Sequence, residues 1–307
     1  MNVKLGFDLN CFSNRLMEPE SWTDFVASCG VKTVQYNFDL LDHLLPRGIW
    51  ERIARRTLDC CAEKGIRIKC AFGGHNHHQN YLGHPDDEVA RAYEDSYCRM
   101  ADVTAALGGE GFGTCFAITS TAVHNNPTRR AEVLNRAIDS YRRIAEYSRR
   151  QGVKYLLFET TSVPRETCAT FAETDWVLEQ LGDAAIPMKV CLDVGHRNQE
   201  NSTAPEADYR QWILRYGRVS PLIHIQQCNA ATSAHWPFLD EFNGKGDVLP
   251  AEVLRTVADS GTEDEVLLAL EVRHRAYFPD EYDWEKNLRQ SVDYWRRWIT
   301  LEDESRS

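Results

Sequence analysis

Short apolar runs alternate with longer amphipathic segments along nearly the whole chain. Runs such as YLLFE and MKVCLD are almost continuously apolar, which is typical of parallel strands that are buried on both faces. The pattern predicts eight strands, at residues 4–9, 33–36, 67–72, 113–117, 155–159, 189–193, 222–226 and 266–272. It predicts helices near residues 21–29, 49–64, 86–107, 127–150, 174–181, 205–216, 250–259 and 280–300.

The segment 127–150 illustrates the basis of the helix predictions. Leu134, Ile138, Tyr141 and Ala145 recur at spacings of three and four residues, which gathers them on one helical face. The arginines of this segment are interleaved with acidic residues, so we interpret its other face as solvated. We therefore expect a long helix with one apolar face.

Residues at the predicted boundaries agree with these assignments. Asn126 can cap the first turn of the helix that follows it, and Pro127 suits the first helical position. Gly30 and Gly65 each follow a helix and precede a strand, where a left-handed turn favours glycine. Boundary residues and periodicity thus support the same elements.

Eight strand–helix pairs in about 300 residues predict a (β/α)8 TIM barrel, and we expect residues 1–307 to form a single domain. A doubly wound open sheet is the alternative, although eight strands fit a closed barrel better. The loop after the first strand, GFDLNCFSN, lacks the glycine pattern of a dinucleotide site.

Composition narrows the class of protein. Hydrophobic residues make up 43% of the chain, but no stretch approaches the roughly 20 apolar residues of a membrane span. The ten cysteines show no paired C-x-x-C, which favours reduced, buried thiols in a cytoplasmic protein. The first ten residues predict a strand rather than a signal sequence. The formal charge of −11 argues against nucleic acid as a partner.

Polar side chains stand at the ends of the last four predicted strands. These residues are Glu159, Asp193, His224 and Glu271, one from each strand. The carboxyl ends of barrel strands surround the active site, so the four side chains would meet at one mouth. Each stands in or beside an apolar run, where an unpaired charge is costly.

Three carboxylates and one imidazole in one place would repel one another and take up protons unless a cation were bound. Mainly oxygen donors with one nitrogen suit Mn²⁺, Mg²⁺ or Co²⁺, with Zn²⁺ as a further possibility. Taken singly, each residue has a structural explanation. His224 could be a core histidine, and Asp193 with His196 could cap a loop. The joint pattern on four successive strands favours a metal site.

The order of Glu159, the D-x-x-H motif of Asp193 and His196, then His224 and Glu271 resembles the xylose isomerase-like TIM-barrel superfamily. This superfamily includes ketose 3-epimerases, hydroxypyruvate isomerases, inosose dehydratases and endonuclease IV. The resemblance spans nearly the whole chain and is specific for the superfamily rather than for a substrate. In the ketose 3-epimerases the matching positions hold a Mn²⁺-like ion, which makes Mn²⁺ the expected metal.

The resemblance also implies that Glu159 and Glu271 exchange protons with the sugar and that His196 binds it. A metal chelated by a carbonyl and a neighbouring hydroxyl acidifies the adjacent C–H and stabilises the resulting enediolate. Return of the proton to another carbon isomerises the sugar, and return on the opposite face epimerises it. We expect an isomerase or epimerase of a small, unphosphorylated ketose or aldose.

The chain departs from the ketose 3-epimerase pattern where those enzymes contact substrate. The loop after the fifth strand reads TTSVPRE, so Arg165 and Glu166 are candidates to replace an acidic contact. Ala230 stands where the epimerases carry an arginine, and Arg273 or Arg275 could supply that charge instead. Gln226 stands where many relatives have lysine.

Weaker candidates come from histidines and aromatic residues. Of the histidines in GGHNHHQNYLGH, we expect His75 to reach the substrate and most of the others to lie in a solvated loop. Trp236, Trp22, Tyr36 and Phe72 could form apolar walls against a sugar, although a core position explains each more easily. Among the four we retain Trp236 as a substrate-binding residue.

Three other functions stay open. An inosose-type dehydratase would share the enediolate but expel a hydroxyl. An endonuclease IV-like repair enzyme is disfavoured by the negative charge and by the absence of a D-x-H motif after the seventh strand. A sugar-binding barrel without catalysis is the third. We expect a small sugar as the partner, no nucleic acid or membrane, and a possible homo-oligomer.

Overall fold

A computed structural model of the chain describes residues 2–73, 81–198, 200, 201, 203–262, 264–275 and 280–299. Eight strands form a closed barrel in the order β1-β10-β7-β6-β5-β4-β3-β2. Their bounds are β1 Val3–Asp8, β2 Thr33–Asn37, β3 Arg67–Phe72, β4 Gly111–Cys115, β5 Tyr155–Glu159, β6 Met188–Asp193, β7 Leu222–Ile225 and β10 Val266–Leu270. The predicted (β/α)8 class is confirmed.

Ten helices of the described residues lie between or after these strands. Their bounds are α1 Pro19–Ser28, α2 Arg47–Lys64, α3 Asp87–Ala106, α4 Thr121–His124, α5 Pro127–Arg150, α6 Phe171–Gln180, α7 Tyr209–Tyr216, α8 Asp240–Asn243, α9 Pro250–Asp259 and α10 Asp280–Trp295. Short 3-10 turns occur at Leu9–Phe12, Tyr81–Gly83, Pro205–Ala207 and Gly217–Val219.

The boundary residues act as the sequence predicts. Asn126 accepts a hydrogen bond from the backbone of Arg129 at 3.0 Å, and Pro127 is the first residue of α5. Gly30 and Gly65 have φ angles of 70° and 64°, in the left-handed region. The exposed face of α5 carries ion pairs, as expected for a solvated face.

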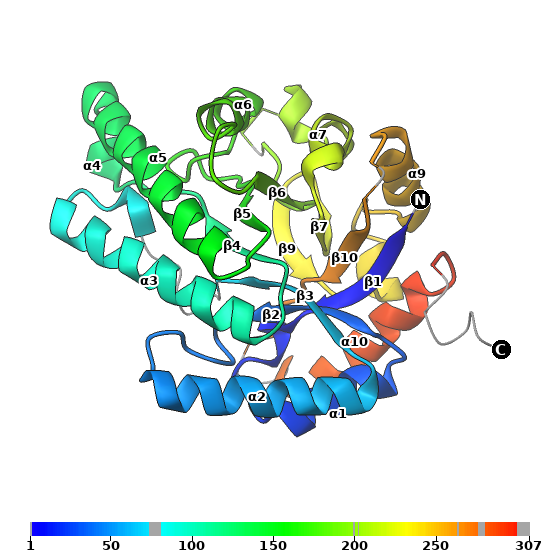
Figure 1. Ribbon diagram of the computed structural model, residues 1–307. Coiled ribbons are helices and arrows are strands. Elements are labelled where there is room, and N and C mark those ends of the chain that lie inside the picture. Colours follow the sequence, from blue (N-terminus) through cyan, green and yellow to red (C-terminus); the bar gives the residue numbers. More distant parts are fainter. Residues whose placement is uncertain are drawn as a thin grey trace. The chain divides into compact units, whose positions relative to one another are not determined.

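The chain divides into two compact units. The first unit comprises Met1–Gln35, Cys60–Arg67 and Cys191–Ser307, and the second comprises Tyr36–Asp59 and Ile68–Val190. In the second unit α3 and α5 run side by side (Figure 1), and Arg143 of α5 pairs with Glu94 of α3 at 2.7 Å. That the whole chain is a single domain stays a prediction.

Two features of the first unit differ from the expected elements. The segment 205–216, expected as one helix, is a 3-10 turn followed by α7, because Asp208 caps a new helix by accepting from the backbone of Arg210. An unexpected antiparallel hairpin follows β7, made of β8 (Gln227–Asn229) and β9 (Thr232–Trp236). This hairpin carries residues of the candidate site.

Three of the four aromatic residues considered as walls of a sugar site lie in the core, the position that explained them more easily. Trp22, Tyr36 and Phe72 are all buried. All ten cysteines are free, and nine of them are buried. Among the described residues, every helix is too short or too polar to cross a lipid bilayer.

Candidate metal centre

Three of the four predicted ligands gather in the first unit. Asp193, His224 and Glu271 each offer one donor atom, and these atoms lie within 4.8 Å of one another. Strand register causes this: Asp193 pairs with His224 across β6 and β7, and His224 pairs with Ala269 of β10, two residues before Glu271. The three side chains are largely buried, with 0, 1 and 12% exposure respectively.

The ring of His224 is held on both sides. Its Nε2 lies 2.6 Å from Oε1 of Gln35, a buried residue of β2. Since a carbonyl oxygen only accepts, Nε2 carries the proton and donates it. Nδ1 lies 3.2 Å from Oε2 of Glu271. In the neutral form of the ring Nδ1 is an acceptor that faces the carboxylate, an arrangement that a cation stabilises, and in the protonated form this contact is an ion pair.

The carboxylate of Asp193 is fixed by donors. The backbone N–H of Gly195 donates to Oδ1 at 2.6 Å, and Nε2 of Gln226 lies 2.9 and 3.0 Å from the two carboxylate oxygens. Burial alone would raise the pKa of Asp193, but the opposing effects, of which the neighbouring imidazole of His196 is the largest, outweigh burial and lower the pKa. Asp193 is therefore an anion that is ready to act as a ligand.

His235 of the β8–β9 hairpin links two parts of the cluster. Its Nδ1 lies 3.2 Å from the carbonyl oxygen of Glu271, and its backbone N–H donates to Oε1 of Gln226 at 2.7 Å. Burial lowers the pKa of His235 to about 3, so the ring is neutral and can donate through Nδ1. Its φ of 48° lies in the left-handed region, and the residue is buried.

The D-x-x-H loop presents a second imidazole beside Asp193. Nε2 of His196 lies 3.6 Å from Oδ2 of Asp193, and the His196 side chain is 19% exposed. The next residue, Arg197, is buried and makes a bidentate ion pair with Asp247 at 2.6 and 2.9 Å. This pair anchors the loop that carries His196.

The remaining ligand candidate, Glu159, belongs to the second unit. It ends β5, is buried, and pairs in register with Cys115 of β4. In the loop that follows, Glu166 is also buried, whereas the side chain of Arg165 is 43% exposed. Glu159 thus lies at the carboxyl end of its strand, as the sequence predicts.

The other predicted substrate contacts have different surroundings. Arg273 is exposed, and its backbone N–H donates to the carbonyl of His235 at 3.0 Å. Trp236 is half-buried, and its ring stacks on Phe242 with 5.5 Å between ring centroids. His75 lies outside the described residues. Contacts of these three residues with a sugar stay predictions.

Three residues that hydrogen-bond to the candidate ligands or to their neighbours were not predicted from the sequence as parts of the site. Gln35 and His235 were not singled out, and Gln226 was noted only as a departure from relatives. All three are buried. The available signal was a glutamine inside or directly after an otherwise apolar strand, as in TVQYN and LIHIQ, because a buried amide requires a partner.

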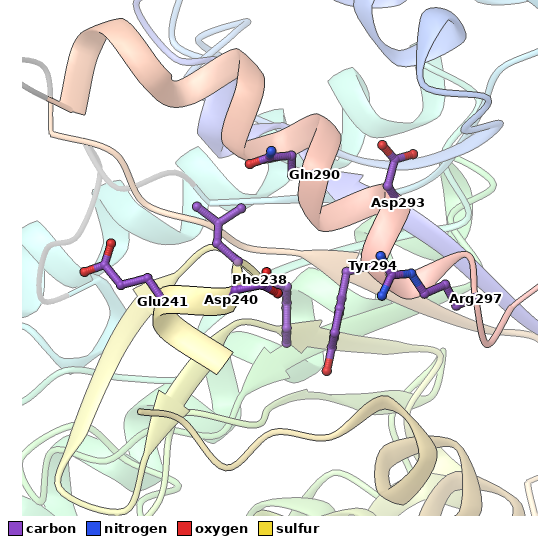
Figure 2. A pocket seen from close by; sticks show the side chains of 8 residues that line it. Phe238, Asp240, Glu241, Gln290, Asp293, Tyr294 and Arg297 are labelled. Atoms are coloured by element: carbon purple, nitrogen blue, oxygen red, sulfur yellow. The ribbon is translucent and has the colours of Figure 1, made fainter. Parts of the chain in front are cut away.

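A separate cavity of about 480 Å³ lies between α10 and the segment around α8. Figure 2 shows the rings of Phe238 and Tyr294 face to face within its lining. Asp240 and Arg297 also line it, whereas the predicted site residues within the described part of the chain do not. The cavity is therefore distinct from the cluster around Asp193.

The donor set fits a divalent cation. Two carboxylates and an imidazole nitrogen converge in a largely buried place, and their outer atoms are oriented by amide and backbone groups. Metal-binding histidines and carboxylates in proteins commonly have such outer partners. The mainly oxygen donors suit Mn²⁺ or Mg²⁺.

Comparisons with known proteins show the family to which the chain is related. The family model of the xylose isomerase-like TIM barrel matches residues 23–298. D-erythrulose 1-phosphate 3-epimerase of Brucella abortus is 30% identical over 299 residues, which cover 96% of each chain.

Solved structures show the same fold. A xylose isomerase-like protein from Rhodospirillum rubrum has a TM-score of 0.88 and 26% identity, covering 96% of this chain and 99% of its own. D-psicose 3-epimerase from Clostridium cellulolyticum, solved with D-tagatose, has a TM-score of 0.72 and 16% identity. That match covers 96% of this chain and 98% of the epimerase, and it shows the fold alone.

Proposed function

Because the chain belongs to the xylose isomerase-like TIM-barrel family, we propose that it is a divalent-metal-dependent 3-epimerase of a small ketose. The observation that carries the proposal is the buried cluster of Asp193, His224 and Glu271. A cluster with this donor set at the carboxyl ends of barrel strands is suited to binding a metal and polarising a carbonyl substrate.

We assign the metal to Glu159, Asp193, His224 and Glu271, with Mn²⁺ as the expected ion. Glu159 completes the set in this proposal because it ends β5, the neighbour of β6 in the barrel order. When bound, the ion would stabilise negative charge that develops on the carbonyl oxygen of the substrate.

The two glutamates act as the acid–base pair. One carboxylate removes the proton from the carbon beside the carbonyl, and the electrons of that C–H bond move toward the carbonyl oxygen. The other glutamate, in its carboxylic acid form, returns a proton to the same carbon from the opposite face, which inverts its configuration. Glu159 and Glu271 come from strands on either side of β6 and β7 in the barrel order, which supports access to opposite faces.

His196 and Arg273 are the proposed substrate contacts. The half-buried imidazole of His196 stands beside the ligand Asp193 and can hydrogen-bond a sugar hydroxyl. Arg273 lies two residues past Glu271, and its exposed side chain can reach an outer hydroxyl or a phosphate. Trp236 and His75 complete the proposed contacts.

The first substrate to test is D-erythrulose 1-phosphate, because the relative that acts on it is 30% identical along almost the full length. Unphosphorylated ketoses form the second arm, since the sequence led us to expect them. Each is incubated with the Mn²⁺-loaded enzyme, and products are separated by chiral chromatography with mass detection. Appearance of the C3 epimer at unchanged mass supports the proposal. Loss of water would indicate the dehydratase, and no conversion of any ketose would refute both.

A further inference from the structure

Two buried glutamines form hydrogen bonds with the candidate ligands, one as the acceptor and the other as the donor. Gln35 of β2 accepts a hydrogen bond from Nε2 of His224 at 2.6 Å. Gln226, directly after β7, donates through Nε2 to the carboxylate of Asp193 at 2.9 and 3.0 Å. Both glutamines are 0% exposed, so water cannot replace either bond.

We infer that Gln35 and Gln226 are positioning residues that prepare His224 and Asp193 to bind the metal. Gln35 keeps the imidazole proton on Nε2 and so leaves the Nδ1 lone pair for the ion. Gln226 fixes the plane of the Asp193 carboxylate and compensates part of its buried charge. This inference rests on the proposed metal site and adds the residues that orient it.

The surroundings of each amide support the assigned direction. Nε2 of Gln35 is buried and makes no hydrogen bond within the described part of the chain, so only its oxygen has a polar partner there. The oxygen of Gln226, in contrast, accepts from the backbone N–H of His235 at 2.7 Å, which directs its Nε2 toward Asp193. The two amides are therefore not interchangeable.

This difference predicts opposite effects of the same substitution at the two positions. Gln35→Glu keeps an oxygen acceptor opposite His224, and no hydrogen bond is lost because Nε2 of Gln35 makes none within the described residues. The affinity of this variant for Mn²⁺ should therefore be within about threefold of wild type. Gln226→Glu removes the donor and places a carboxylate against Asp193. Loss of an outer partner weakens metal binding by about 10–100-fold, and we expect a loss in that range.

Substitution by lysine at the same two positions should give the opposite result. Gln226→Lys retains a donor toward Asp193 and should retain Mn²⁺ binding. Gln35→Lys presents a donor to Nε2 of His224, which forces the ring proton onto Nδ1 and should weaken binding by at least about tenfold. A purely structural role would make the outcome depend on the size or charge of the new side chain, not on the position.

The test is titration of each purified full-length variant with Mn²⁺, read by calorimetry and by the electron paramagnetic resonance signal of free Mn²⁺. Circular dichroism of the metal-free proteins shows which variants fold, and either the glutamate pair or the lysine pair is sufficient for the comparison. Equal loss in both members of a pair, or tight binding by Gln35→Lys with weak binding by Gln35→Glu, overturns the inference. A wild-type protein that binds no Mn²⁺ would instead refute the metal site itself, and this inference with it.

Discussion

The Arg197–Asp247 ion pair offers a sharp test of how the D-x-x-H loop is held. Arg197 is 3% exposed and donates from Nη1 and Nη2 to the two oxygens of Asp247. Its Nε donates to the carbonyl of Val194 at 2.9 Å, within the loop between Asp193 and His196. The substitution Arg197→Met removes the ion pair and every other hydrogen bond of the guanidinium group but keeps an apolar side chain of similar length.

The expected cost follows from the burial of the two partners. Breaking a buried ion pair by removing one partner costs about 3–5 kcal/mol. The Asp247 side chain is 46% exposed, so water can solvate it after the substitution, and the cost falls below that range. We therefore expect Arg197→Met to lower the free energy of unfolding by about 2 kcal/mol.

The matched control is Arg210→Met. Like Arg197, Arg210 lies over the ring of Tyr209 and belongs to an ion pair, here with Asp208 at 2.8 Å. Its side chain, however, is 43% exposed. An exposed pair of this kind contributes at most about 1 kcal/mol. Urea unfolding of the metal-free proteins, followed by tryptophan fluorescence, measures both variants. If Arg197→Met costs no more than Arg210→Met, the loop is not anchored by the buried pair.

Three further predictions concern the metal, a histidine and two glycines. Chelation with EDTA should abolish epimerisation and lower the melting temperature, and Mn²⁺ should restore both; full turnover after exhaustive chelation would contradict the metal assignment. Burial, aided by the charge of Arg15, lowers the pKa of His274 to about 4. As the pH falls from 6.5 toward 4, His274 therefore takes up a proton in the unfolded chain but not in the folded protein. This difference should lower the free energy of unfolding by at most about 2 kcal/mol between pH 7 and pH 5. His274→Gln should remove that part of the pH dependence in urea unfolding, and an unchanged slope would disprove the origin given. Gly6→Ala would press a Cβ against the carbonyl oxygen of Thr33 and should destabilise by about 2–3 kcal/mol. Gly48→Ala, whose Cβ would meet no described atom within 4 Å, should stabilise by about 0.4–1 kcal/mol. Equal melting temperatures for the two alanine variants would refute this contrast.

Much of the fold could be predicted because local signals and burial agree. The strands β3 and β5 and the helix α5 have the predicted bounds, since apolar runs or helical periodicity end at clear boundary residues. The strand-end positions of Glu159 and Asp193 were predictable for the same reason, because a charge that interrupts an apolar run marks where a buried strand ends.

A buried glutamine can be noticed in the sequence, but the partners of Gln35 and the role of His235 could not be predicted from local pattern. Gln35 precedes its partner His224 by 189 residues, and only the closing of the barrel brings β2 and β7 to the same mouth. The β8–β9 hairpin has short strands of three and five residues without clear alternation of apolar and polar positions. His235 therefore gave no signal, and nothing in the sequence indicates its left-handed backbone.

The most direct test of the proposed chemistry is hydrogen exchange at the carbon beside the carbonyl. The Mn²⁺-loaded enzyme is incubated in deuterium oxide with D-erythrulose 1-phosphate and with unphosphorylated ketoses, and the C3 proton is followed by NMR. We predict that deuterium enters at C3 as the epimer forms and that Glu271→Gln abolishes both. Epimer formation without deuterium at C3, or full exchange in Glu271→Gln, would contradict the two-glutamate account.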